Sequence, residues 1–170
     1  MDPTFAGRQH LPWIRLSVVL TISALFPACS PDQSVDLLKE RQAEVKEFSE
    51  TLIKDLHDIG PSGWLLHFDP SEEFYMASDG NLVFPDADSA TVFVNQLSET
   101  LDIIDLELLD LRQDHHSSGF VSIASPYEES ITDKQGSVIS FGGFVTMLLI
   151  KNGDEWKIRN LHWSSPANED

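Results

Sequence analysis

Two apolar strands joined by a tight turn are predicted by residues 143–166, GFVTMLLIKNGDEWKIRNLHWSSP. Asn152-Gly153 is the strongest short signal for a two-residue hairpin, because both residue types tolerate the positive φ that such a turn needs. Residues 144–150 before the turn are apolar except for Thr146, which predicts a strand covered on both faces. The sequence therefore predicts an antiparallel hairpin as the last part of the domain.

Working back from this hairpin, the apolar pattern keeps a period of two as far as residue 100. Residues 100–111, 119–131, 137–150 and 155–165 are predicted as four long antiparallel strands. Gly142-Gly143 marks a bend or bulge within the third of them. A bent strand is how a sheet curls around a pocket, so we expect a curved sheet.

Helical periodicity dominates the first half of the domain. Apolar side chains in residues 35–59 recur at spacings of three, four and seven, which predicts an amphipathic helix. Residues 62–68 are predicted as a short second helix and residues 88–97 as a third. Between them, residues 74–84 form a short hairpin around a Ser-Asp-Gly-Asn turn. Helices segregated from antiparallel strands define the α+β class.

Length and charge exclude several classes of protein. The chain has 170 residues, enough for one domain. It carries 28 acidic and 11 basic side chains, a net charge of −17, which argues against nucleic acid as a partner. A single cysteine excludes an internal disulfide and a zinc site built from several cysteines. We expect neither a metal nor a cofactor.

The first residues have the features of a targeting segment. Arg8 and Arg15 supply positive charge, and residues 16–26 form an uncharged apolar run. Eleven residues are too few to span a bilayer but suit the core of a signal peptide. Ala28-Cys29 follows this run and resembles a bacterial lipobox, which implies that Cys29 is the lipid-attachment site and membrane anchor.

These features predict a lipoprotein precursor. Residues 1–28 would be the signal peptide, 29–34 a tether, 35–166 the domain and 167–170 a tail. In the lipoprotein pattern an Asp after the cysteine would favour the inner membrane, so Ser30 favours an outer-membrane lipoprotein facing the periplasm of the bacterial envelope. An ordinary secreted protein and a cytoplasmic protein are the alternatives.

The order of elements resembles the nuclear transport factor 2-like superfamily, in particular its SnoaL-like branch. The resemblance rests on residues 73–80 (EFYMASDG), 127–136 and 143–166, the last with Trp156-Lys157-Ile158, His162 and Ser164. It implies a cone-shaped half-barrel, in which three helices pack on the concave side of a curved antiparallel sheet around a deep apolar pocket. It also implies a homodimer formed through the outer face of the sheet. Members include isomerases, dehydratases and non-catalytic binders, so the fold leaves the activity open.

Strand alternation selects the candidate pocket residues. In the last strand it directs Asn160, His162 and Ser164 into the cone and leaves Leu161 and Trp163 outside. An exposed apolar pair of this kind is typical of a partner surface, so Leu161 and Trp163 are the predicted interface.

The other elements add four residues to the predicted ligand-binding set. Tyr127 and Glu129 share one face of their strand, Phe144 lies on the next strand, and Trp64 is a candidate lid. Packing alone is the simpler role for several of them. A Glu, a Tyr and a His facing one cavity could also exchange protons with a substrate.

Three functions remain open at this point. The favoured one is a binding or accessory domain for a small, largely apolar ligand, because no catalytic motif is present and the catalytic residues are unknown. The second is an isomerase or dehydratase that uses His162 with Glu129 or Tyr127. The third is a protein-interaction module of the envelope that docks through Leu161 and Trp163.

Overall fold

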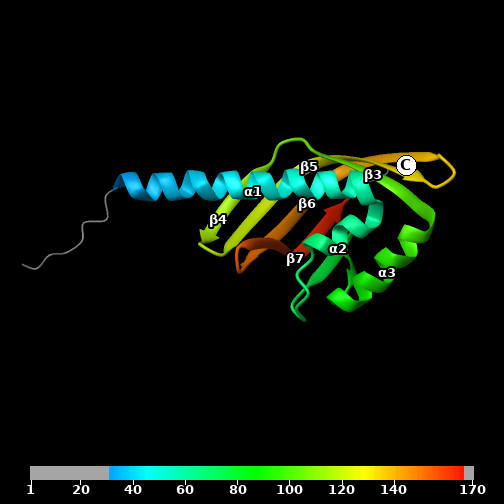
Figure 1. The fold of residues 1–170 in the computed structure, drawn as a ribbon, viewed down its shortest axis with the longest axis horizontal. Helices are drawn as coiled ribbons and strands as arrows, with labels where there is room; N and C mark the ends of the chain where they lie inside the picture. The colour runs from blue at the N-terminus through cyan, green and yellow to red at the C-terminus, as the bar shows by residue number, and fades with distance from the viewer. Residues whose placement is uncertain (1–30, 167–170) are drawn as a thin grey trace, which may run out of the picture.

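A seven-stranded sheet curves around two long helices in the computed structural model, which describes residues 31–166 and side chains from residue 35 onward (Figure 1). The elements are, in chain order, α1 (Pro31–Ile59), the 3-10 turn η1 (Gly60–Ser62), α2 (Gly63–His67), β1 (Tyr75–Ser78), β2 (Asn81–Phe84), α3 (Ala87–Thr100), β3 (Leu101–Leu108), β4 (Arg112–Ser117), β5 (Phe120–Asp133), β6 (Val138–Asn152) and β7 (Glu155–Ser164). The predicted signal peptide, Cys29 and the tail lie outside the described residues. Among the helices of residues 31–166, none combines the length and the apolar character needed to cross a membrane.

The helices differ in size and role. α1 begins at Pro31, so residues 31–34 of the expected tether belong to the first turn of a helix that extends beyond the sheet (Figure 1). Proline suits a first helical turn because its fixed φ is already helical. α2 has only five residues, so the second predicted helix is little more than one turn after η1. The Asp86 carboxylate caps α3 by accepting a hydrogen bond from the Ser89 amide at 2.7 Å.

The sheet has the order β2-β1-β7-β6-β5-β3, with β4 also pairing with β5. The expectation of a purely antiparallel sheet is wrong, because β1 runs parallel to β7 and the sheet is mixed. β1 and β7 are far apart in sequence, so no hairpin turn between them sets their relative direction. The predicted strand at residues 100–111 ends at Leu108, and β4 then returns to the same neighbour, β5.

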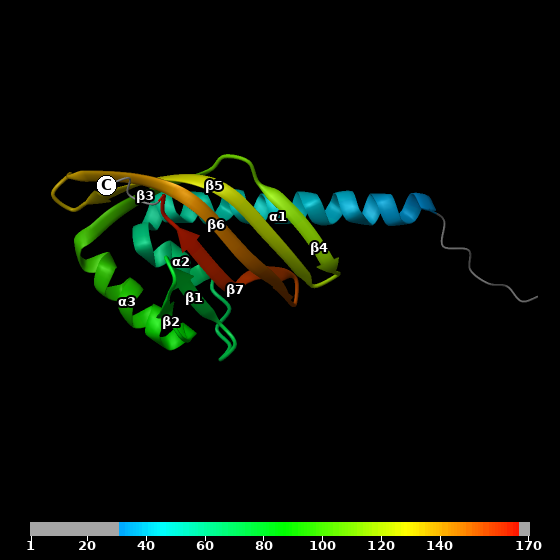
Figure 2. The ribbon, with the colours of Figure 1, turned by 180° about the vertical axis from the view of Figure 1, so that it is seen from behind.

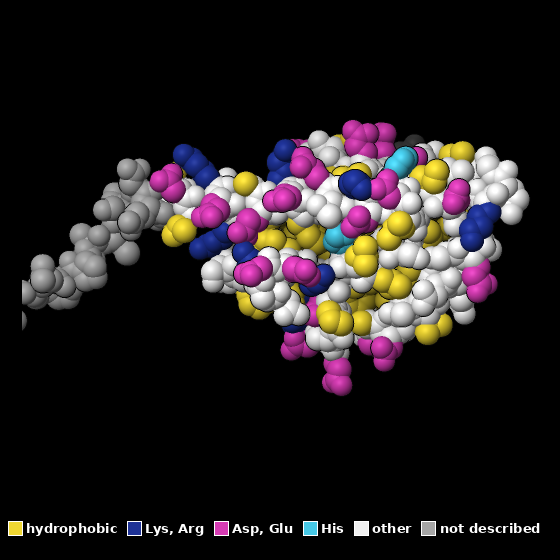
Figure 3. All heavy atoms as spheres, in the orientation of Figure 1, with side chains coloured by type: hydrophobic (Ala, Val, Ile, Leu, Met, Phe, Trp, Pro, Cys, Tyr) yellow, Lys and Arg dark blue, Asp and Glu magenta, His cyan; other side chains and the backbone are white. Residues whose placement is uncertain are grey.

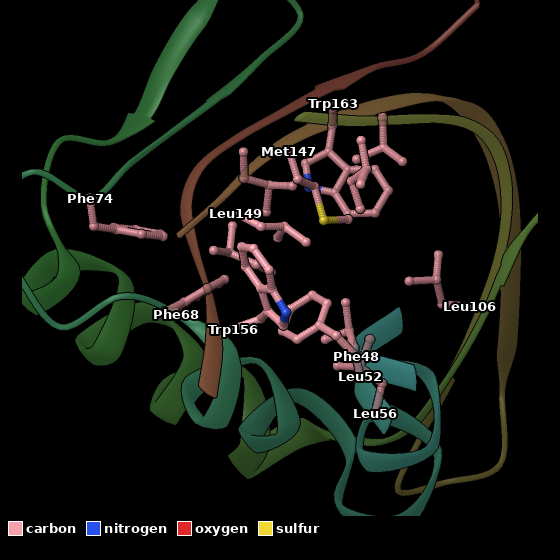
Figure 4. Close-up of a cluster of buried hydrophobic side chains, with 14 of the residues drawn as sticks. Phe48, Leu52, Leu56, Phe68, Phe74, Leu106, Met147, Leu149, Trp156 and Trp163 are labelled. Carbon is pink, nitrogen blue, oxygen red and sulfur yellow. The ribbon is translucent and has the colours of Figure 1, made fainter. Parts of the chain in front are cut away.

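α1 packs across the concave face and builds the core. Phe48, Leu52 and Leu56 of α1 point at Leu149 and Trp156 of the sheet (Figure 4). One polar contact holds this packing in register: the Glu44 carboxylate accepts hydrogen bonds from Lys151 at 2.8 Å and from the Trp156 indole at 3.1 Å. Figure 2 shows the opposite, convex face of β5, β6 and β7, which no helix of residues 31–166 covers.

The last strand changes face halfway along its length. Leu149 pairs with Ile158 and Leu148 pairs with Asn160, so Arg159 is an extra residue without a partner on β6, which is a β-bulge. The prediction that Leu161 and Trp163 lie outside is therefore wrong, because they are only 2% and 8% exposed and join the core.

The same bulge turns the alternate residues of β7 outward. Asn160, His162 and Ser164 lie beyond the extra residue and point to the convex face, where His162 is exposed. The prediction that these three residues face the pocket is also wrong, for the same reason: strict alternation does not survive a bulge.

Candidate functional site

A cavity of about 390 Å³ lies between the concave face of the sheet, the β1–β2 hairpin, α2 and α3. Its wall is mostly apolar, and α3 contributes Phe93, Val94 and Leu97. Figure 3 shows apolar side chains gathered around α2 and α3, the elements that border this cavity. A cavity of this size and lining is typical of a small-molecule site.

Aromatic rings at right angles form the inner part of the wall. The rings of Tyr127 and Trp163 are 4.4 Å apart at 81°, and those of Trp163 and Trp64 are 5.8 Å apart at 90°. Edge-to-face pairs of this kind contribute about 0.5–1.5 kcal/mol beyond the apolar area they bury. Three elements, α2, β5 and β7, are therefore joined at the cavity through their aromatic side chains.

The Tyr127 ring reaches this position because residue 143 on the neighbouring strand is glycine. A Cβ atom at Gly143 would lie 3.1 Å from the Cε1 atom of Tyr127 and would overlap the carbonyl oxygen of Ser164. The bend predicted at Gly142-Gly143 is therefore a close approach of three neighbouring strands, β5, β6 and β7, at the wall of the cavity.

Glu129 is the charged side chain of the cavity wall. It pairs with Leu106 of β3 on one side and with Phe141 of β6 on the other, both apolar. Burial raises the pKa of Glu129 to about 7, since the charged form loses its hydration. Within residues 35–166, no Lys, Arg or His lines the cavity with it, and no side chain forms an ion pair with it.

The structure divides the predicted ligand-binding residues into two groups. Trp64, Tyr127 and Glu129 line the cavity together. Phe144, Asn160, His162 and Ser164 are on the convex face, on the other side of the sheet. Alternate residues of β6 face inward, and Val145 is one of them. Its neighbour Phe144 therefore faces outward and is 42% exposed.

Sequence reasoning missed several cavity residues. Leu161, Trp163 and Ser165 follow the bulge, for which the sequence offered no signal. Phe93 and Leu97 could have been found, since they are four residues apart on one face of a predicted helix. Phe141 could have been found by extending the alternation of its strand from Val145.

The polar side-chain groups of the described lining residues are the Glu129 carboxyl, the Tyr127 phenol, two serine hydroxyls and the indole N–H groups of Trp64 and Trp163. Burial also raises the pKa of Tyr127, and the nearby Glu129 adds to this effect, so the phenol stays protonated at neutral pH. A carboxyl with a pKa near 7 can donate or accept a proton. No group of three or more His, Cys, Asp or Glu in the described part of the chain is placed to hold a metal ion.

Comparison with known proteins identifies the fold. A nuclear transport factor 2-like superfamily protein from Salmonella enterica superposes with a TM-score of 0.57 at 15% identity, covering 81% of this chain and 96% of that one. A ketosteroid isomerase-like protein from Erwinia carotovora gives 0.57 at 14% identity, covering 75% and 98%. A hexachlorocyclohexane dehydrochlorinase gives 0.59 at 12% identity, covering 78% and 89%.

These similarities establish the fold from the structure alone, because the sequence identities are only 12–15%. The chain has the fold of the nuclear transport factor 2-like superfamily, an α+β cone with a mixed sheet. No protein-family model matches the sequence, and no curated protein matches it.

Proposed function

We propose that this domain binds a small, largely apolar molecule in the cavity between the sheet, α2 and α3. The observation that carries the proposal is the cavity itself, whose 390 Å³ are lined by aromatic and aliphatic side chains with few polar groups. Its volume lies in the range of about 300–1,000 Å³ that is usual for small-molecule pockets.

A pair of valine substitutions tests the proposal. Val83 lines the cavity, whereas Val92 is an exposed residue of α3 outside it. In the full chain, Val83→Trp should weaken binding of the neutral dye Nile red at least fivefold, because the indole fills the cavity. Val92→Trp should leave binding unchanged. Equal dye binding by both variants would show that the dye, and by extension a ligand, does not use this cavity.

A second candidate is an acid–base enzyme of the isomerase or dehydratase type. The specific observation in its favour is Glu129, a carboxyl with a pKa of about 7 beside the Tyr127 phenol. Glu129 would move the proton and Tyr127 would donate a hydrogen bond to a developing oxyanion. His162 has no part in this version, since it lies on the convex face.

Deuterium exchange tests the enzymatic version. If Glu129 acts as a base, the full chain accelerates exchange of the α-protons of a cyclic ketone in D₂O, followed by NMR, and Glu129→Gln abolishes the acceleration. Glu128→Gln, the same charge change on the exposed neighbour, should leave it intact. No acceleration by the unmodified chain across a panel of such ketones would remove this candidate.

The convex face supports a homodimer in place of the predicted Leu161–Trp163 surface. The central outward positions of its three middle strands carry no Asp, Glu, Lys or Arg: Ser122, Ala124 and Pro126 of β5, Phe144, Thr146 and Leu148 of β6, and Asn160, His162 and Ser164 of β7. In a chain of net charge −17, a neutral face lets a second copy approach without direct repulsion.

The location remains a proposal from the sequence. We infer that Cys29 receives lipid and that the domain stands on the periplasmic side of a bacterial envelope membrane, since the cysteine directly follows the apolar run of residues 16–26 and Ala28. Metabolic labelling with a palmitate analogue tests this: label should enter the natural chain and be lost in Cys29→Ser. Labelling that persists in Cys29→Ser would overturn it.

A further inference from the structure

Glu129 is an acidic side chain that has no basic partner among residues 35–166 and lies in an apolar cavity. Its strand neighbours Leu106 and Phe141 are apolar, and the cavity lining within residues 35–166 includes no basic side chain. A charge removed from water is costly unless it is paired. Residues 35–166 do not supply that pair, so the carboxyl is neutralised either by its own proton or by a cationic group of a ligand.

The basic side chains nearest to Glu129 are already paired elsewhere. A groove on the other side of Glu129 is lined by Glu50, Lys54 and His57 of α1, Asp105 and Glu107 of β3, and Glu128 of its own strand. Lys54 forms an ion pair with Asp58, and His57 Nδ1 lies 2.6 Å from Asp105 Oδ1. Tyr127 is the other titratable group of the cavity. Neighbouring acids therefore outnumber the available cations.

The aromatic wall adds a second feature that selects positive charge. Seven of the nineteen lining residues are aromatic. The Tyr127 and Trp163 rings make an angle of 81°, and the Trp163 and Trp64 rings make an angle of 90°. In an edge-to-face pair the edge of one ring covers a face of the other, so a cation can approach only the ring faces that remain open to the cavity, and each such face attracts it. Tyr127 and Glu129 lie two residues apart on one strand face, roughly 7 Å, so one ammonium group can contact both.

The charge of the whole chain acts in the same direction. A net charge of −17 concentrates cations near the surface and repels anions. The net charge neither attracts nor repels a neutral ligand.

Together these observations lead to one inference, which rests on the proposed binding function and narrows it. We propose that the ligand is a hydrophobic ammonium compound, whose positive nitrogen pairs with Glu129 against the aromatic wall and whose apolar body fills the cavity toward α3.

Two probes of equal shape test the charge requirement in the full chain. Benzyltrimethylammonium carries the charge, and neopentylbenzene replaces its nitrogen by carbon. Binding is followed through tryptophan fluorescence and the indole NMR signals. Glu129→Gln should raise the Kd of the cation at least tenfold and leave the Kd of the neutral probe within twofold. Glu128→Gln, on the exposed face of the same strand, should change neither.

A matched pair of phenylalanines tests the aromatic contribution. Phe141 lines the cavity opposite Glu129, whereas Phe144 is equally exposed, at 42% against 43%, but on the convex face. Phe141→Leu should raise the Kd of the cation about threefold or more and change that of the neutral probe less. Phe144→Leu should have no effect on either.

Binding of the cation should become stronger as the pH rises. Only the carboxylate pairs with the cation, so the cation should bind several-fold more tightly at pH 8 than at pH 6, and this change should vanish in Glu129→Gln. A neutral ketone that instead binds more weakly as pH rises, in a way that needs Glu129, would show a protonated acid acting as donor and would overturn the proposal.

The remaining outcomes separate this inference from the proposed function. If the neutral probe binds and Glu129→Gln affects the cation no more than Glu128→Gln does, the ammonium ligand is wrong and the apolar cavity function stands. If neither probe binds the unmodified chain, both are overturned.

Discussion

Arg159 Nε lies 2.5 Å from Asp69 Oδ2, and this ion pair holds the point at which β7 changes face. Asp69 is 2% exposed, and its carboxylate also accepts hydrogen bonds from the Ser71 amide and hydroxyl. Arg159 is the extra residue of the bulge. Because the bulge turns Leu161 and Trp163 inward, we expect this contact between two polar side chains to help fix which apolar residues line the cavity.

Breaking this pair should destabilise the domain. Asp69→Asn leaves the Arg159 guanidinium with only its exposed partner Glu73, so we expect the free energy of unfolding to fall by about 2 kcal/mol. Asp110→Asn, which removes a carboxylate from the exposed pair with Arg112, should cost less than about 0.5 kcal/mol. Urea unfolding measures both. Equal losses would show that Asp69 does not hold the bulge.

The same pair predicts a loss of stability in acid. Burial alone would raise the pKa of Asp69, but the hydrogen bonds from Ser71 and the ion pair with Arg159 outweigh it and lower the pKa. Its contribution is therefore complete above the unfolded pKa of about 3.9 and is lost as the pH falls through the lower, folded value. The stability difference between the natural chain and Asp69→Asn should shrink below about pH 4. A difference that is constant down to pH 2 would contradict this.

Gly143→Ala should be strongly destabilising. The added methyl group meets the Ser164 carbonyl and the Tyr127 ring, so β6 and β7 must separate, at a cost of about 1–3 kcal/mol or more. Gly119→Ala is the matched control, since its Cβ would meet only the Lys151 Cβ at 4.0 Å. Thermal unfolding followed by near-UV circular dichroism reports both the stability and the Tyr127–Trp163 packing. An unchanged spectrum for Gly143→Ala would contradict the predicted clash.

Glu129→Gln should stabilise the domain at alkaline pH. Burial raises the pKa of Glu129 to about 7, so the natural chain loses stability as the pH rises from about 4.3 through 7, when the buried carboxyl ionises. The variant avoids this cost, which we expect to be of order 2–3 kcal/mol at pH 8 and absent at pH 4. Glu128→Gln should show no such pH-dependent gain. Chemical denaturation at the two pH values decides between these outcomes.

A charge at the centre of the convex face should separate the two copies of a dimer. Thr146 is exposed and pairs with Ala124 on one side and His162 on the other. Thr146→Glu places two like charges across the proposed interface, so light scattering after size exclusion should report a monomer where the natural chain is a dimer. Gln135→Glu, at the tip of the β5–β6 hairpin, should leave the dimer intact. A dimer that persists in Thr146→Glu would place the interface elsewhere.

Local pattern was sufficient to predict most of the elements. The spacing of apolar residues in α1 and α3 and the turns at Asp79-Gly80 and Asn152-Gly153 led to helices and hairpins that the structure contains. The inward phase of β5, from Val121 to Tyr127 and Glu129, also followed from alternation. In these segments the role of each residue depends on its near neighbours in sequence, so the local sequence is enough to predict that role.

The sequence by itself determined the periodicities, the turns, the charge of −17 and the presence of Glu129 and Tyr127 on one strand face. Only the tertiary structure decided the phase of β7 and the parallel pairing of β1. The bulge residue Arg159 pairs with Asp69, 90 residues away in sequence, and no local pattern encodes such a pair. The raised pKa of Glu129 likewise depends on the tertiary structure. Its carboxyl is desolvated because α1, β3 and β6 enclose it, and a pKa responds to that enclosure, not to neighbours in sequence.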